Sequence, residues 1–217
     1  MVGRFQFCMM AVLIAGAAFA AEPLVTNTVF TAFDTETTGF SPKSDRLVEI
    51  GAVRFRGDGE ILAATNWLVN PGIPIPFYAT EVHGITTEMV TNAPPFSEVW
   101  KAFVAFCGDS VLLAHNAPFD VGFLKAELKR ANIDAPALPV LDTLPLFRAW
   151  FPHALSHALE PLATYLGVDK GTYHRAEADS YHIIDVMEVG MKSRPQLQLQ
   201  RLEHDAGGLI RLDGKVH

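Results

Sequence analysis

The stretch at residues 29–40, "VFTAFDTETTGF", decides the fold because an apolar segment runs directly into two carboxylates. Its first five residues are mostly β-branched or aromatic, which is typical of a buried strand. Asp34 and Glu36 follow, and residues two apart in an extended chain point to the same face. Two carboxylates so close repel each other and are costly to bury. Taken alone, the pair also fits a solvated turn, which Gly39 would help to form.

The composition indicates a globular protein. The chain has 217 residues, enough for one α/β domain, and it is 49% hydrophobic and 19% charged. Its formal net charge of −7 argues against a protein that coats nucleic acid non-specifically. It does not exclude an enzyme that handles phosphates through a bound metal ion.

Residues 1–20 have the pattern of a signal peptide. Arg4 precedes an apolar run, and residues 18–20, "AFA", suit cleavage before Ala21. The apolar stretch, residues 7–21, is shorter than the roughly 20 residues that span a bilayer. We therefore expect a periplasmic or secreted protein without a membrane anchor in its mature form. A translation start further along the chain would leave a cytoplasmic protein instead.

The pattern of the remaining chain predicts a mixed α/β domain over residues 21–193. Strands are expected at 28–34, 46–56, 59–69, 110–116 and 139–143. Helices are expected at 96–108, 117–133, 143–151, 156–167 and 175–192. Antiparallel strands come first and strand–helix alternation later, which favours a mixed five-stranded sheet flanked by helices. Residues 194–217 show no clear period and are expected to form a C-terminal tail or an extension that binds a partner.

Two further motifs carry acidic residues. "HNAPFD" ends at Asp120, at the start of a predicted helix, and "HRAEAD" joins His174 to Asp179. If these elements pack as expected, their two aspartates meet Asp34 and Glu36 at the carboxyl edge of the sheet. Four gathered carboxylates need a counter-charge, and hard divalent cations such as Mg²⁺ or Mn²⁺ supply one. Two such ions can hold the attacking and leaving oxygens of a phosphoryl displacement.

The motifs "DTETTG", "HNAPFD" and "HRAEAD", in this order and spacing, resemble those of the DEDDh family of 3′–5′ exonucleases. The chain is similar in this respect to the proofreading (epsilon) subunit of bacterial DNA polymerase III. The resemblance covers about residues 28–192, and the segments "VEIGAV" and "EVHGIT" agree with it. It implies a ribonuclease H-like fold. It also implies hydrolysis of phosphodiester bonds from the 3′ end of a nucleic acid, releasing nucleoside 5′-monophosphates.

The resemblance also assigns the catalytic residues. Asp34, Glu36, Asp120 and Asp179 become the ligands of two Mg²⁺ or Mn²⁺ ions. His174 becomes the general base that takes a proton from the attacking water, a role that suits histidine because its ordinary pKa lies near neutral pH.

Four residues are candidates for substrate binding. By the same resemblance, Thr37 and Thr38 lie near the 3′-terminal sugar, and His83 of "HGIT" approaches the terminal nucleotide. The two threonines could instead only shape their turn. Asn116 either reaches the substrate or fixes its loop. Phe40 could stack on a base or cover the core.

Other polar residues are interpreted as structural. We expect His182 and His115 to be packed within the fold rather than catalytic. Asp142 is expected to cap a helix, and Glu49, inside an apolar strand, to be satisfied by hydrogen bonds.

The expected partners are single-stranded DNA or RNA with a free 3′ end. The resemblance also allows a homodimer, and a polymerase partner is not excluded. Two alternative functions remain open at this point. One is a polymerase-associated proofreading subunit, and the other is a non-catalytic nucleic-acid-binding protein of the same fold.

Overall fold

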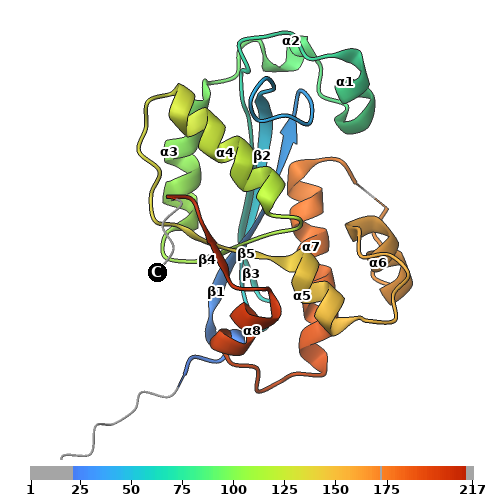
Figure 1. Cartoon of the computed structure of the whole chain (residues 1–217). Helices are drawn as coiled ribbons and strands as arrows, with labels where there is room; N and C mark the ends of the chain where they lie inside the picture. Colours follow the sequence, from blue (N-terminus) through green and yellow to red (C-terminus); the bar gives the residue numbers. More distant parts are fainter. Residues whose placement is uncertain (1–21, 172, 214–217) are drawn as a thin grey trace, which may run out of the picture.

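The computed structural model describes residues 22–171 and 173–213 (Figure 1). The segment expected to be a signal peptide, residues 1–20, lies outside the described residues. Among the helices of the described part, none is long and apolar enough to cross a membrane.

In the described part of the chain, six strands form one mixed sheet in the order β3-β2-β1-β4-β5-β6. The strands are β1 (Val29–Thr37), β2 (Leu47–Arg56), β3 (Ile61–Leu68), β4 (Val111–Ala114), β5 (Pro139–Asp142) and β6 (Leu209–Arg211). β1 pairs with β2 antiparallel and with β4 parallel, so the central strand joins the two halves of the sheet. The structure confirms the predicted mixed sheet and adds a sixth strand to the five expected.

The helices cover both faces of this sheet (Figure 1). They are α1 (Phe77–His83), α2 (Thr87–Val90), α3 (Phe96–Cys107), α4 (Pro118–Arg130), α5 (Thr143–Trp150), α6 (Leu159–Leu166), α7 (Ala176–Lys192) and α8 (Leu199–Asp205). One core joins α3 and α4 to the sheet, and the other joins α5, α6, α7 and α8 to its opposite face.

The alternation of side chains along β1 decides where its carboxylates point. Phe30 and Ala32 belong to the core under α7, whereas Phe33 belongs to the core under α3 and α4. Because side chains alternate along a strand, Asp34 and Glu36 continue the face toward α7. β1 extends beyond the predicted end at residue 34 and still pairs with β2 at these positions.

The segment expected to be a tail is folded. α8 packs its buried Leu202 into the core under α7, and β6 pairs antiparallel with β5. Leu199 N also donates to Pro23 O at 2.9 Å, so this segment holds the start of the described chain. The sequence prediction was wrong here because single buried residues in short elements leave no measurable period.

The proline-rich segment after β3 contains two short helices that the sequence did not predict. α1 ends at Gly84, which adopts a left-handed conformation that glycine accepts without strain. α2 begins after Thr86, whose side chain caps Met89 N. Both helices pack on a small third core that includes Val48 of β2, and they stand at the end of the sheet where β1 ends (Figure 1).

Candidate active site

Three carboxylates converge at the end of β1. One oxygen from each of Asp34, Glu36 and Asp179 lies within 4.8 Å of the others. The first two come from β1, and Asp179 comes from the first turn of α7, which packs on the same face of the sheet. The predicted convergence of these three residues is therefore present in the structure.

Asp120 is not part of this group of three and approaches it from the other face of the sheet. It lies in the first turn of α4, behind Pro118 at the helix start, and is 2% exposed. Thr35 Oγ1, which points away from the α7 face, donates to Asp120 Oδ1 at 2.7 Å. The charge of Asp120 raises the pKa of Asp34 further, after burial has raised it, so all four predicted ligands act on one another.

The four carboxylates are electrostatically strained. Burial, followed by the neighbouring charges, raises the pKa of Glu36 to about 8. Burial also raises the pKa of Asp120 to about 7, against the hydrogen bond from Thr35. The pKa values of Asp34 and Asp179 are raised in the same direction, again chiefly by burial. A divalent cation relieves this strain by replacing protons, and an all-oxygen set of carboxylates suits Mg²⁺ or Mn²⁺.

His174 lies at the edge of this cluster, one residue outside the N-cap of α7. Its backbone N–H donates to Asp179 Oδ2 at 2.9 Å, and its φ of 61° is left-handed, which is uncommon for a residue other than glycine. The imidazole is exposed to solvent. The geometry thus places an exposed histidine beside a predicted metal ligand, and its role as a base stays a prediction.

The two threonines after Glu36 shape the turn that closes β1. Thr37 Oγ1 donates to Gly39 O at 2.6 Å, and Thr38 Oγ1 accepts from Arg46 N at 3.0 Å. Tyr78 of α1 donates its hydroxyl to Thr38 O at 3.2 Å. The turn is therefore fixed from two sides, and contact of either threonine with substrate stays a prediction.

The other two substrate candidates lie in different surroundings. His83 is 4% exposed; its Nδ1 accepts from Ile85 N at 3.0 Å, and burial lowers its pKa. Asn116 is exposed, has a φ of 61°, and its backbone N–H donates to Asp142 Oδ1 at 3.0 Å. His83 is thus almost closed off from solvent, whereas Asn116 lines an open pocket of about 590 Å³ beside β4. Contact of either residue with substrate stays a prediction.

The residues predicted to be structural make structural contacts. Asp142 caps α5 through Leu144 N, and His115 is held by Thr143 and by the carbonyl of His157. His182 is buried and stacks on Tyr173 with ring centroids 4.1 Å apart.

Glu49 is fully buried and accepts hydrogen bonds from Asn66, Arg175 and Ala176. Arg175 lies inside the motif "HRAEAD" but was not among the predicted site residues. No sequence signal pointed from Arg175 to Glu49, because they lie 126 residues apart.

Comparison with known families and proteins gives a consistent result. The Exonuclease (RNase_T) family model matches residues 31–187. A PolC-type DNA polymerase III of Clostridium perfringens is 40% identical over 163 residues, which is 75% of this chain and 11% of that protein. The corresponding protein of Bacillus cereus is 37% identical over 194 residues, which is 86% of this chain and 13% of that protein. The chain thus spans roughly a tenth of the length of these curated relatives.

Solved structures of nucleases share the fold. Exonuclease X in complex with 5′ overhanging duplex DNA is 25% identical, with a TM-score of 0.65 over 82% of this chain and 99% of that chain. The nuclease domain of 3′hExo, described as a DEDDh family member bound to rAMP, is 19% identical, with a TM-score of 0.72 over 79% of this chain and 96% of that chain. The second likeness supports the fold alone. With the carboxylate cluster and the family match over residues 31–187, the chain belongs to the Exonuclease family.

Proposed function

We propose that this protein is a metal-dependent 3′–5′ exonuclease that uses two Mg²⁺ or Mn²⁺ ions and releases nucleoside 5′-monophosphates. The observation that carries the proposal is the convergence of Asp34, Glu36 and Asp179 within 4.8 Å, with Asp120 behind them. This is the ligand chemistry that such ions need, in a chain of the Exonuclease family.

Each residue has a definable task in such a reaction. The four carboxylates hold the cations, which would polarise the scissile phosphate and lower the pKa of the attacking water. Thr35 keeps Asp120 oriented through its hydrogen bond. His174, exposed beside Asp179, is placed to accept the proton of that water.

The surface around the turn after β1 favours a single-stranded 3′ end. Phe40 on this turn is 83% exposed, and Phe77 and Tyr78 of α1 are 75% and 53% exposed. The Tyr78 hydroxyl bonds to Thr38 O, which ties these two aromatic segments together. Exposed rings stack on unpaired bases with little regard to sequence. The net charge of −7 gives no general attraction to long duplex.

The PolC-type relatives support a second candidate, in which the domain proofreads for a polymerase. Our proposal of a signal peptide at residues 1–20 opposes it, because an exported chain does not meet a replicative polymerase. Fractionation of cells that express the full chain, with N-terminal sequencing of the product, distinguishes the two. If the chain is found outside the cytoplasm and begins near Ala21, a free exported enzyme is favoured over a proofreading domain.

The experiment for the main proposal uses a 5′-labelled single-stranded DNA oligonucleotide, with the matching RNA in parallel. Wild type is compared with Asp179→Ala and with a chelator control, in Mg²⁺ and in Mn²⁺. We expect a ladder that shortens from the 3′ end and disappears in both controls. If folded wild-type protein leaves the oligonucleotide intact with both metals, the exonuclease proposal is wrong. The remaining hypothesis is then a non-catalytic nucleic-acid-binding protein of the same fold.

A further inference from the structure

A fully buried carboxylate that is not among the predicted metal ligands lies beside the cluster. Glu49 of β2 is the direct cross-strand partner of Glu36 of β1, and residues paired in this way project to the same face. Both therefore face the start of α7. Like charges directly opposite each other destabilise a sheet, so Glu49 needs a partner of its own.

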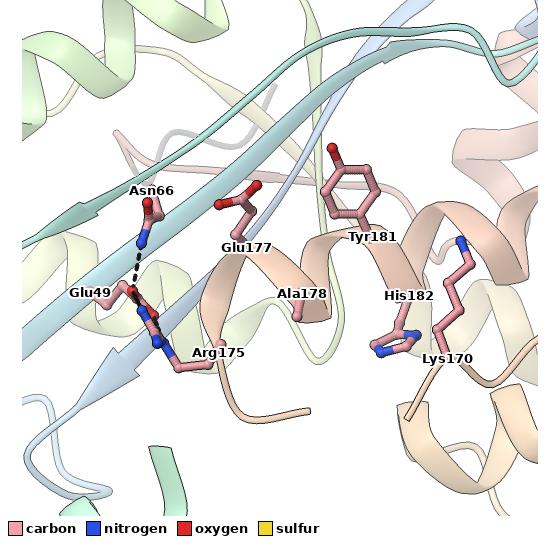
Figure 2. A pocket seen from close by; sticks show the side chains of 8 residues that line it. All are labelled: Glu49, Asn66, Lys170, Arg175, Glu177, Ala178, Tyr181 and His182. Carbon is pink, nitrogen blue, oxygen red and sulfur yellow. Dashed lines mark hydrogen bonds and ion pairs between the residues drawn. The ribbon is translucent and has the colours of Figure 1, made fainter. Parts of the chain in front are cut away.

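The two oxygens of Glu49 are occupied by protein donors. Oε1 accepts from Arg175 Nη2 at 2.7 Å and from Asn66 Nδ2 at 2.9 Å. Oε2 accepts from Arg175 Nε at 3.2 Å and from Ala176 N at 3.1 Å. Figure 2 shows the guanidinium of Arg175 facing Glu49 at one end of a pocket of about 550 Å³, with Lys170 at the other end. The contact is two-pronged, the geometry in which arginine binds a carboxylate most specifically.

These bonds fix the first turn of α7. Ala176 is the first residue of α7, and its backbone N–H is one of the groups that a helix start leaves without an internal partner. Glu49 accepts from it across the sheet. Two residues along β2, Gly51 lies so close to the helix that an added Cβ would stand 2.1 Å from Ala176 C. Ser180 Oγ also donates to Gly51 O at 3.3 Å.

The same turn carries two residues of the site. His174 immediately precedes Arg175, and Asp179 follows Ala176 by less than one helical turn. The backbone N–H of His174 is already bonded to the Asp179 carboxylate. The position of both side chains relative to Asp34 and Glu36 on β1 therefore depends on how firmly residues 175–176 are held against β2.

We propose that Glu49 and Arg175 are a positioning pair for the reaction: their two-pronged contact holds the turn from which His174 and Asp179 enter the site. This rests on the proposed exonuclease function. Neither residue touches substrate in this proposal. Their loss leaves the carboxylates of β1 in place and displaces the groups contributed by the α7 side.

The test compares Glu49→Gln, Arg175→Lys and Arg175→Gln with wild type, in steady-state cleavage of the labelled oligonucleotide with Mn²⁺. Glu49→Gln loses acceptor capacity toward Arg175. Arg175→Lys keeps the charge near Glu36 but not the two-pronged geometry. We expect kcat to fall roughly ten- to a hundredfold in all three variants, since a displacement of about 1 Å has effects of this size. We expect KM to stay within about twofold, because the substrate surface around Phe40 is untouched.

Glu177→Gln is the matched control, because it removes a negative charge beside Arg175 without a bond to Glu49. It should keep the wild-type kcat. The double variant Glu49→Gln/Arg175→Gln should be no slower than the slower single variant, since both remove one contact. Thermal unfolding is measured for every variant, and a variant that does not fold at the assay temperature is set aside in favour of Arg175→Lys.

Three results would overturn the proposal. The first is a wild-type kcat in folded Glu49→Gln and Arg175→Lys. The second is activity retained in Arg175→Lys and lost in Arg175→Gln, which would show that only the charge matters. The third is a raised KM with an unchanged kcat. Failure of the exonuclease function itself is distinguishable, because it would appear as inactive wild-type protein in the same assay, and the positioning role would then fall with it.

Discussion

At the scale of single residues, the site depends on which face of β1 each side chain occupies. Asp34 and Glu36 face α7, whereas Thr35 between them faces α4 and orients Asp120 by a hydrogen bond. One strand end thus gathers ligands from both sides of the sheet. A shift of register by one residue would exchange these faces and dismantle the cluster.

His174 can be separated from the metal ligands by substitution. Because the hydrogen bond from His174 to Asp179 comes from the backbone N–H, His174→Ala leaves that bond intact. We expect kcat to fall by roughly 10²–10⁴, the usual contribution of a general base, with Mn²⁺ affinity unchanged in a direct titration. His153→Ala, an exposed histidine elsewhere, is the control. A His174→Ala enzyme within threefold of wild type would remove the residue from the mechanism.

The raised pKa of Glu36 predicts a pH-dependent stability. Its folded pKa of about 8 exceeds the ordinary 4.5, so the native state holds a proton that the unfolded chain releases. This contribution is fully present below pH 4.5 and is lost as the pH rises through 8. In chelator, the Tm of wild type should therefore fall between pH 5 and pH 8, and the Tm of Glu36→Gln should fall less.

Adding Mn²⁺ at pH 8 should restore the wild-type Tm, because the ion binds the folded state alone. It should restore the Tm of Glu36→Gln less, since a ligand oxygen is lost. A wild-type Tm in chelator that is as high at pH 8 as at pH 5 would contradict the raised pKa.

At the scale of secondary-structure elements, α7 lies close to both the sheet and α5. Gly51 of β2 has no side chain, so the start of α7 can lie directly against the strand. Near the other end of α7, Gly190 lies against Trp150 of α5. A glycine inside a helix normally costs about 1 kcal/mol relative to alanine, but at position 190 a larger residue would collide with the Trp150 ring.

Replacing Gly190 should reverse the usual effect of alanine in a helix. An added Cβ would lie 2.1 Å from Trp150 Cε3, and overpacking of a core costs about 1–3 kcal/mol. We expect Gly190→Ala to lower the free energy of unfolding measured in urea. Gly122→Ala in α4, where the nearest atom outside the helix is Pro42 Cγ at 3.3 Å, should cost less than Gly190→Ala, because a shift of a few tenths of an ångström accommodates the added Cβ. Equal stabilisation of both variants would show that α7 and α5 are less tightly packed than the structure indicates.

The elements that the sequence predicted are those with a strong local signal. The three motifs lie at the end of β1 and at the starts of α4 and α7. The apolar periods of these three elements are long enough to recognise. α1 and α2 are short and lie in a proline-rich segment, where the pattern favours a loop. The contact between Glu49 and Arg175 joins β2 to α7 across 126 residues, so no local pattern reveals it. For the same reason, the sequence described Glu49 as satisfied without naming its partners.

At the scale of the whole molecule, the last described segment supplies the edge strand beside β5. β6 pairs with β5. Without β6, β5 would be the edge strand, with its outer backbone groups unpaired. α8 buries Leu202, and Leu212 follows β6 into the other core. Residues 197–199 bond to the start of the described chain at residues 23–25. This segment is part of the fold rather than a free docking extension.

Removing residues 194–217 tests that conclusion. The truncation removes the buried Leu202 and Leu212, and with them a burial contribution of roughly 1.5–3 kcal/mol each, and it leaves β5 as the edge strand. We expect the truncated chain to unfold at lower urea concentration and to associate at high protein concentration, as measured by light scattering. Gln200→Ala on α8, which changes only an exposed polar side chain, should leave both properties unchanged. Wild-type stability in the truncated chain would mean that α8 and β6 add nothing to the core, and the segment would again be open to a partner.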